Sequence, residues 1–433
     1  MKSSMGIRSG LLRGVVGLTL ACSTAGVVLL APPASAQVLK GSTPHNQVMV
    51  TKPVSIAAHK STKILSLTMT LPAGLLENVR AIGDGSLTNG TTHSIIVVCF
   101  IAMDGKTVGS RYTVTVGAKS SVIVPYGVWL PAVQSGRHTF TLTAKSPGAL
   151  KFTGGSLLTF GLPAADPNGN LANSGANVTG SIPVGTTSFT NVVKDVLTTE
   201  TPTNIDVDGW IGLRNTSKSA ATVTLRYGLD GRYTTATYDA TLPPGAFEDL
   251  PVTTSCFNTA PGEHLLTEQA LSTSKGIVIN GGTLGGVGLP PPEASSNLSE
   301  IQSAFSYGTP LTMTAGGFET LVSVTNNSEG VAPLSNETDS EMTGWVTAFN
   351  PGTRAMKLSL RQVTDGAVET TDPTLIVTVS PHSQVSVPTG YVGCTNMQLA
   401  TDTFSVQGAS SLSGLQIEVA AERATAWPSP TTP

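Results

Sequence analysis

Short stretches in which apolar and polar residues alternate recur along most of the chain. Residues 222–229 read TVTLRYGL, so that every second side chain is apolar and the residues between are Thr, Arg or Gly. Residues 135–144 (SGRHTFTLTA) and 375–379 (LIVTV) are similar and rich in β-branched residues. This period of two is typical of half-buried β-strands. Asp-Gly and Pro-Gly turn signals separate such runs, and few stretches show a helical period. The pattern predicts an all-β protein.

The chain contains an internal repeat. Residues 209–231 (GWIGLRNTSKSAATVTLRYGLDG) align without a gap with residues 344–366 (GWVTAFNPGTRAMKLSLRQVTDG), with eight identities in 23 positions. The shared residues include Trp210 with Trp345 and Asn215 with Asn350. A match of this quality indicates two copies of one structural unit.

A third, more diverged copy lies upstream. Asn89 stands fifteen residues before Asp104-Gly105, the interval that also separates Asn215 from Asp230 and Asn350 from Asp365. The first two copies also share a Gly-x-His motif, which ends at His138 and at His264. We therefore expect three related modules in tandem.

Composition places the boundaries of these modules. Residues 163–175 and 289–297 are rich in Pro, Gly, Asn and Ser and are typical of linkers. The predicted organisation is a signal peptide (1–36) followed by β-sandwich modules at 37–165, 166–293 and 294–433, the last with a short Pro/Thr tail. The run of Asn-Thr-Ser, alternating strand, Asp-Gly and Pro-Gly resembles immunoglobulin-like modules of bacterial extracellular proteins. That resemblance implies immunoglobulin-like sandwiches, and jelly rolls are the alternative.

The repeated residues have structural interpretations. We expect Trp210 and Trp345 to anchor the core where a strand begins, with ligand contact as the alternative. The asparagines at 89, 215 and 350 are expected to satisfy backbone groups in a turn. Asp104, Asp230 and Asp365 are expected to set hairpins together with the glycines that follow them. Arg226 and Arg361 lie on the outer face of their strands, where we expect a carboxylate partner.

The N-terminus has the features of an export signal. Lys2, Arg8 and Arg13 precede an apolar stretch at 15–31, and Ala34-Ser35-Ala36 resembles a cleavage site. A retained membrane anchor and lipidation at Cys22 are the weaker alternatives. We expect the product to be secreted and extracellular, either released or held non-covalently at the cell surface, with no transmembrane segment in the mature chain.

Charge is scarce. Only 12% of the 433 residues are charged, about half the usual share. With 24 basic and 27 acidic residues, no net positive field exists to attract nucleic acid, so we expect no nucleic-acid partner. The alternating strands instead predict neutral, Thr- and Ser-rich outer faces.

Three cysteines follow residue 36. Cys99 aligns with Leu225 and Leu360 in the other copies, which indicates a small buried apolar residue. Cys256 and Cys394 occupy matching places in the second and third copies, so a disulfide between them is a candidate. No cysteine lies in a Cys-His signature of a catalytic thiol.

Catalytic and metal-binding motifs are weak. The six histidines are scattered singly, and His138 and His264 are expected at an edge or turn. Two short acidic segments, 206–209 (DVDG) and 166–170 (DPNGN), could supply calcium ligands, but neither recurs, and turn or linker roles are the preferred interpretation. We expect no catalytic site, metal or cofactor.

The sequence thus favours a non-catalytic structural or assembly protein of the cell exterior. Its expected partners are further copies of itself or other cell-envelope proteins. The alternative is an adhesin or ligand-binding protein that recognises a protein or a glycan. An enzyme with an unrecognised site is the third hypothesis, because a catalytic triad can form from residues that are distant in sequence.

Overall fold

The computed structural model describes residues 45–50, 52–73, 76–163, 172–178, 180–234, 237–289, 300–327, 337–368, 374–398 and 401–428. These residues form strands, turns and bends, and none of them lies in a helix, so the all-β prediction is confirmed. No helix among them could cross a membrane. The predicted signal peptide, Cys22 and most of both predicted linkers lie outside these ranges, so the cleavage site and the module boundaries stay predictions.

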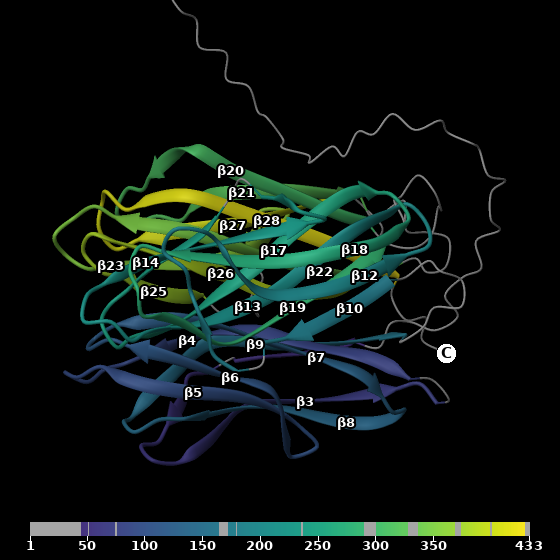
Figure 1. Ribbon diagram of the computed structural model, residues 1–433, viewed down its shortest axis with the longest axis horizontal. Coiled ribbons are helices and arrows are strands. Elements are labelled where there is room, and N and C mark those ends of the chain that lie inside the picture. The colour runs from purple at the N-terminus through teal and green to yellow at the C-terminus, as the bar shows by residue number, and fades with distance from the viewer. Residues whose placement is uncertain are drawn as a thin grey trace, which may run out of the picture.

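The strands of the described ranges form six antiparallel sheets, two in each third of the chain. The strands of module 1 are β1 (His45–Met49), β2 (Val54–Ile56), β3 (Ser61–Leu71), β4 (Glu77–Thr88), β5 (Ile95–Met103), β6 (Lys106–Val116), β7 (Ser121–Val133), β8 (Gly136–Lys145) and β9 (Leu150–Pro163). Those of module 2 are β10 (Ala172–Asn177), β11 (Ile182–Pro183), β12 (Thr190–Thr199), β13 (Thr203–Asn215), β14 (Ala221–Leu229), β15 (Arg232–Tyr233), β16 (Tyr238–Leu242), β17 (Phe247–Thr259), β18 (Gly262–Ser272) and β19 (Ile277–Leu289). Those of module 3 are β20 (Glu300–Thr312), β21 (Glu319–Asn327), β22 (Glu337–Asn350), β23 (Met356–Thr364), β24 (Ala367–Val368), β25 (Leu375–Val379), β26 (Ser383–Gln398), β27 (Thr401–Ser410) and β28 (Gln416–Pro428). Figure 1 shows module 1 in purple and blue, module 2 in teal, and module 3 in green and yellow.

The strand order is the same in every module. In module 1, one sheet runs β1-β9-β4-β7 and the other β3-β8-β5-β6. The orders β10-β19-β13-β17 and β20-β28-β22-β26 repeat the first sheet in modules 2 and 3. In the second sheet, β6 pairs with β5 in module 1, β16 pairs with β14 in module 2, and β25 pairs with β23 in module 3. The first strand therefore pairs with the last, the second with the seventh, the third with the sixth and the fourth with the fifth.

This nested pairing is a double ribbon wound into two sheets, the eight-stranded jelly roll. An immunoglobulin-like sandwich places its first strand beside the second, whereas here β1 pairs with β9. The chain is thus three tandem β-sandwich modules, and their strand order is that of the jelly-roll alternative.

The three modules are packed in a closed cycle. The fifth strand of each module lies against the sixth strand of the next: β6 against β17, β16 against β26, and β25 against β7. The third of these strands, β25, also contacts β4. Equivalent hydrogen bonds mark two of the three junctions. Phe247 N donates to Thr115 Oγ1, and Ser121 N donates to Thr378 Oγ1, each at 2.9 Å. Because the third module contacts the first in this way, the three modules form a closed ring and not a linear array.

Each module has a core between its two sheets, and each core also contains a side chain of the next module. Trp210 of module 2 joins the core of module 1, Trp345 of module 3 joins that of module 2, and Ile123 of module 1 joins that of module 3. Burial of these apolar side chains across the junctions stabilises the cycle.

Candidate functional site at the junction of the three modules

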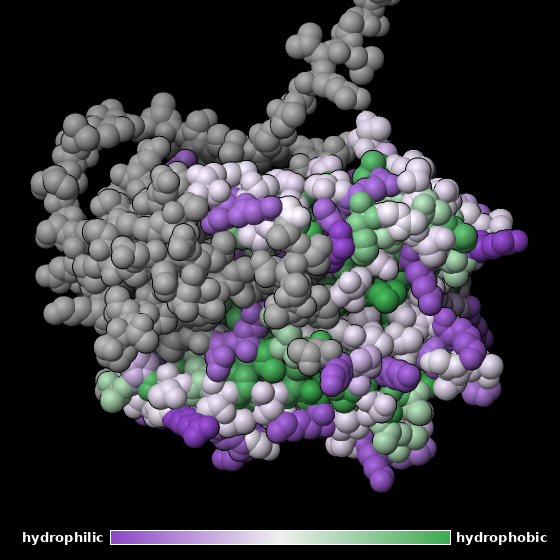
Figure 2. Space-filling view, turned by 180° about the vertical axis from the view of Figure 1, so that it is seen from behind, coloured by the Kyte–Doolittle hydropathy of each residue, from purple (hydrophilic) through white to green (hydrophobic). Residues whose placement is uncertain are grey.

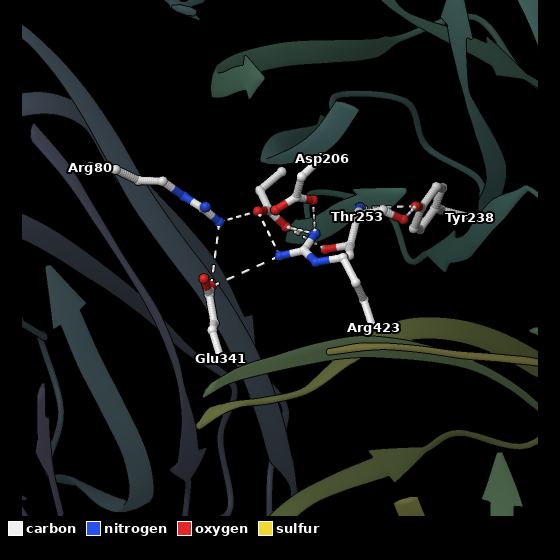
Figure 3. Close-up of polar contacts among 7 residues, drawn as sticks. Arg80, Asp206, Tyr238, Thr253, Glu341 and Arg423 are labelled. Carbon is white, nitrogen blue, oxygen red and sulfur yellow. Dashed lines mark hydrogen bonds and ion pairs between the residues drawn. The ribbon is translucent and has the colours of Figure 1, made fainter. Parts of the chain in front are cut away.

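Five charged side chains meet where the three modules join. They are Arg80 of β4, Asp206 and Asp208 of β13, Glu341 of β22 and Arg423 of β28, and each is exposed by 2% or less. Figure 3 labels four of them, Arg80, Asp206, Glu341 and Arg423, which converge from strands of all three modules. We call these five residues the central cluster. Charged residues are rarely buried this completely unless they are paired.

Asp208 is the hub of the central cluster. Arg80 donates through Nη2 to Asp208 Oδ2. Arg423 forms a two-pronged pair with the same carboxylate, Nη1 to Oδ1 and Nη2 to Oδ2, both at 3.0 Å. Thr253 Oγ1 donates to Asp208 Oδ1 at 3.0 Å. Arg423 also pairs with Asp206, and Glu341 Oε1 lies 3.7 Å from Arg80 Nη2 and 3.9 Å from Arg423 Nη2.

Burial and pairing act differently on the two aspartates. Burial raises the pKa of Asp206 well above its ordinary value, and the attraction of Arg423 offsets this only in part. Burial also disfavours the charged form of Asp208, but Arg423 and Arg80 outweigh it and hold the pKa of Asp208 below its ordinary value. Burial therefore favours the protonated form of Asp206, whereas the two guanidinium groups favour the ionised form of Asp208.

The three modules contribute the same repeat position to the central cluster. Arg80, Asp206 and Glu341 each lie nine residues before the repeated asparagine, at 89, 215 and 350. The expectation of a turn or linker role for residues 206–209 is wrong, because Asp206 and Asp208 lie inside β13 and pair with arginines. The other acidic segment, 166–170, lies outside the described residues. The repeat holds a signal for these residues, since extending it nine positions upstream of each asparagine places three charged residues in register.

A small cavity adjoins the central cluster. Its volume is about 10 Å³, roughly what one water needs and far below the several hundred Å³ of an ordinary ligand pocket. Its lining includes Arg423 and Glu422. The Glu422 carboxyl is buried without a hydrogen-bond partner among the described residues, and burial raises its pKa well above the usual value. Within the described ranges, no group of three or more His, Cys, Asp or Glu could hold a metal ion.

The repeated tryptophans lie within their strands and not at the strand starts that the sequence indicated. Trp210 Nε1 donates to Gly127 O of module 1 at 3.0 Å, and its ring centroid is 4.4 Å from that of Tyr112. Trp345 stacks on Tyr238 of module 2, with centroids 4.1 Å apart. Each tryptophan thus anchors one module to the one before it.

The repeated asparagines close the turn after each third strand. Asn350 Nδ2 donates to the carbonyls of Arg354 and Val379 at 2.8 and 2.9 Å, and its Oδ1 accepts from Gly352 N at 2.9 Å. Asn89 and Asn215 make equivalent bonds to their own turns. At this sharp turn, the asparagine side chains supply hydrogen bonds to backbone groups that would otherwise lack a backbone partner.

The repeated aspartates stand at the tips of hairpins. Asp104, Asp230 and Asp365 have φ of 51°, 51° and 50°, and the glycine after each also has a positive φ, as the tight hairpin turn requires. Oδ1 of each accepts a backbone N–H from the seventh strand, that of Thr139, Leu265 or Thr403, at 2.7–2.8 Å. His138 and His264 lie beside two of these aspartates.

Arg226 and Arg361 differ from expectation, since neither has a carboxylate partner among the described residues. Arg226 Nε donates to Gln269 Oε1 at 2.9 Å, and its guanidinium lies 3.7 Å from the ring centroid of Phe189. Arg361 bonds to Gln407 in the same way. Stacking on an aromatic ring therefore replaces the expected ion pair.

The cysteines are held in strands of the sheets. Cys99 is buried in β5, where burial raises the pKa of its thiol to about 12 and makes it a weak nucleophile. Cys256 is buried in β17. Cys394 pairs along the backbone with Ser340, but its side chain lies outside the described residues, so the Cys256–Cys394 disulfide stays a prediction.

Comparison with known proteins identifies no family. No family model and no curated protein matches the chain. Among solved structures, the chain is similar to PNGF-II at 9% identity, covering 81% of this chain and 99% of that one, with a TM-score of 0.25. It is also similar to a chain with the triple jelly roll fold of an archaeal virus (13% identity, 87% and 91% covered, TM-score 0.17). A third is the CBM22 tandem domain of Paenibacillus barcinonensis Xyn10C (10%, 62% and 99%, TM-score 0.19). Likenesses this remote carry no argument about function, and the jelly-roll assignment rests on the strand order itself.

Proposed function

We propose that this chain is a secreted, non-catalytic building block of the cell exterior. The observation that carries the proposal is the closed cycle of three jelly-roll modules, each with a side chain buried in the core of its neighbour. Such interlocked modules cannot move independently without exposing Trp210 or Trp345 to water. A rigid block suits a load-bearing or lattice-forming role.

The placement of the chemically active groups supports the non-catalytic part of the proposal. The central cluster is buried and internally paired, and the cavity beside it has about the volume of one water. A catalytic site needs titratable groups that a substrate can reach. In this chain the charged groups at the junction instead connect modules.

The export and cell-surface location that we propose are based on the sequence. The features of residues 1–36 support secretion. The surface is consistent with crowded packing outside the cell, because charged residues are few. On the face shown in Figure 2, strongly hydrophilic residues lie scattered among pale and green, less hydrophilic ones. The partners we propose are further copies of this chain or other envelope proteins.

Light scattering and electron microscopy of the purified protein over a wide concentration range test this function. We expect defined oligomers, filaments or sheets that grow with concentration. A strict monomer at all concentrations, together with saturable binding to a host protein or a glycan array, would replace the proposal with the adhesin alternative. Turnover of a small-molecule or polymer substrate would revive the enzyme hypothesis.

A further inference from the structure

The hairpin tip of each module is closed by a contact that needs a proton. In module 1, His138 Nδ1 lies 2.7 Å from Asp104 Oδ2, and His138 Nε2 lies 2.9 Å from the carbonyl oxygen of Gln134. Both partners are acceptors when Asp104 is ionised. A neutral imidazole has only one N–H to donate, so only the imidazolium form satisfies both contacts.

Module 2 repeats this arrangement. His264 Nδ1 lies 2.8 Å from Asp230 Oδ2, and His264 Nε2 lies 2.7 Å from the carbonyl oxygen of Ala260. The His264 side chain is 9% exposed, which shields the contact from water. Two acceptors again face one imidazole, so the same protonated form is required.

Module 3 replaces the imidazole with a carboxyl. Asp402 directly precedes Thr403, whose N–H donates to Asp365 Oδ1, so Asp402 occupies the position of the two histidines. Asp402 is 6% exposed, and its side chain hydrogen-bonds to that of Asp365. Two carboxyl groups can share a hydrogen bond only when one of them holds a proton. We call these three contacts the proton latches.

We propose that the proton latches make this protein most stable in mildly acidic surroundings and loosen the three hairpin tips as the medium becomes neutral to alkaline. This pH dependence of stability is a property of the single folded chain and does not depend on whether the chain assembles.

The directions in which the pKa values of His138 and Asp402 are shifted agree with this geometry. The hydrogen bond with Asp104 raises the pKa of His138 above 6.5, so the stability from this latch is complete below pH 6.5 and is lost as the pH rises through the raised pKa. Burial and the neighbouring Asp365 raise the pKa of Asp402 from 3.8 to about 6. Stability from that latch is therefore complete below pH 3.8 and falls as the pH rises through about 6.

The latches also set an acid limit. The backbone of Thr139 and the side chain of His138, with a smaller contribution from Lys106, hold the pKa of Asp104 below 3.8. The stability that Asp104 contributes is therefore lost as the pH falls through that lowered value. The stability maximum is expected between these limits, in mild acid. Buried Asp249, Glu268 and Glu422 have no hydrogen-bond partner among the described residues, and burial raises their pKa values in the same direction as for Asp402.

The test is urea unfolding of the purified full chain between pH 4.5 and 8. We expect the unfolding midpoint to fall as the pH rises from 5 to 8. Asp402→Asn keeps a hydrogen-bond donor for Asp365 without a titrating proton, so its midpoint should exceed that of the wild type by clearly more at pH 7.5 than at pH 4.5. A midpoint that is flat from pH 5 to 8, or an equal effect of Asp402→Asn at both pH values, would overturn the proposal.

The histidine latches have their own test. His138→Gln should lower the midpoint more at pH 5 than at pH 8, with His93→Gln, at an exposed position, as the matched control. If a latch variant does not fold, NMR titration of the wild-type imidazoles decides. The proposal requires that the His138 imidazole titrates above pH 6.5, and titration at or below pH 6.5 would contradict it.

Discussion

Arg80 of module 1 and Glu341 of module 3 occupy the same position of the repeat, and their side chains lie 3.7 Å apart where the modules meet. The equivalent residue of module 2 is Asp206. Three identical modules in this cycle would bring three like charges together in a buried space, at a large cost. The arginine in one module and carboxyls in the other two remove that repulsion, so the single chain depends on its modules being different.

The two aspartates of the central cluster should respond differently to the same substitution. Asp208→Asn leaves Arg80 and Arg423 without their shared carboxylate, so we expect a loss of about 3–5 kcal/mol in the free energy of unfolding. Asp206→Asn is the matched control. Because burial favours the protonated form of Asp206, we expect a much smaller loss. Equal losses in urea unfolding at pH 7 would show that both aspartates are ionised.

Removal of a junction tryptophan should loosen the neighbouring module. Trp210→Ala deletes the indole that donates to Gly127 O and packs on Tyr112 of module 1. We expect a loss of about 3–5 kcal/mol and faster hydrogen exchange in β6 and β7, which belong to module 1. Val196→Ala, at a position that is 46% exposed, is the control. Faster exchange confined to module 2 would show that Trp210 serves only its own module.

Replacing a repeated asparagine with alanine should destabilise the protein less than replacing it with aspartate. Asn350→Ala loses three hydrogen bonds at a fully buried position, for an expected cost of about 1–3 kcal/mol. Asn350→Asp keeps the acceptor for Gly352 N but places an oxygen against the carbonyls of Arg354 and Val379. Thermal unfolding at pH 7 should rank wild type above alanine and alanine above aspartate. The reverse order of the two variants would assign the main role to Oδ1.

Local features were predictable from the sequence because they depend on neighbours in the chain. The alternation at 222–229 corresponds to β14, and the Asp-Gly pairs lie at hairpin tips. The cyclic packing was not predictable in this way, because the partner of Trp210 is 83 residues distant, in another module. The same limit applies to Asp208 and Arg423, which are 215 residues apart. In the sequence, the acidic segment 206–209 resembles a turn or a calcium-binding motif, because the arginines that pair with it are distant along the chain.

Two glycines allow modules 1 and 2 to approach closely. Trp129 of β7 lies against Gly175 of β10 and Gly285 of β19, and an alanine Cβ at Gly285 would overlap its indole. We expect Gly285→Ala to cost about 1–3 kcal/mol through overpacking. Gly317→Ala is the matched control, since its Cβ would meet no atom within 4 Å.

A double-mutant cycle with Trp129→Phe assigns the Gly285→Ala loss to this junction. The smaller ring should make room for the Cβ, so that part of the loss is recovered in the double variant. The free energies of unfolding of the four proteins measure this coupling. Strict additivity would show instead that the loss arises within the β19 backbone and not between the modules.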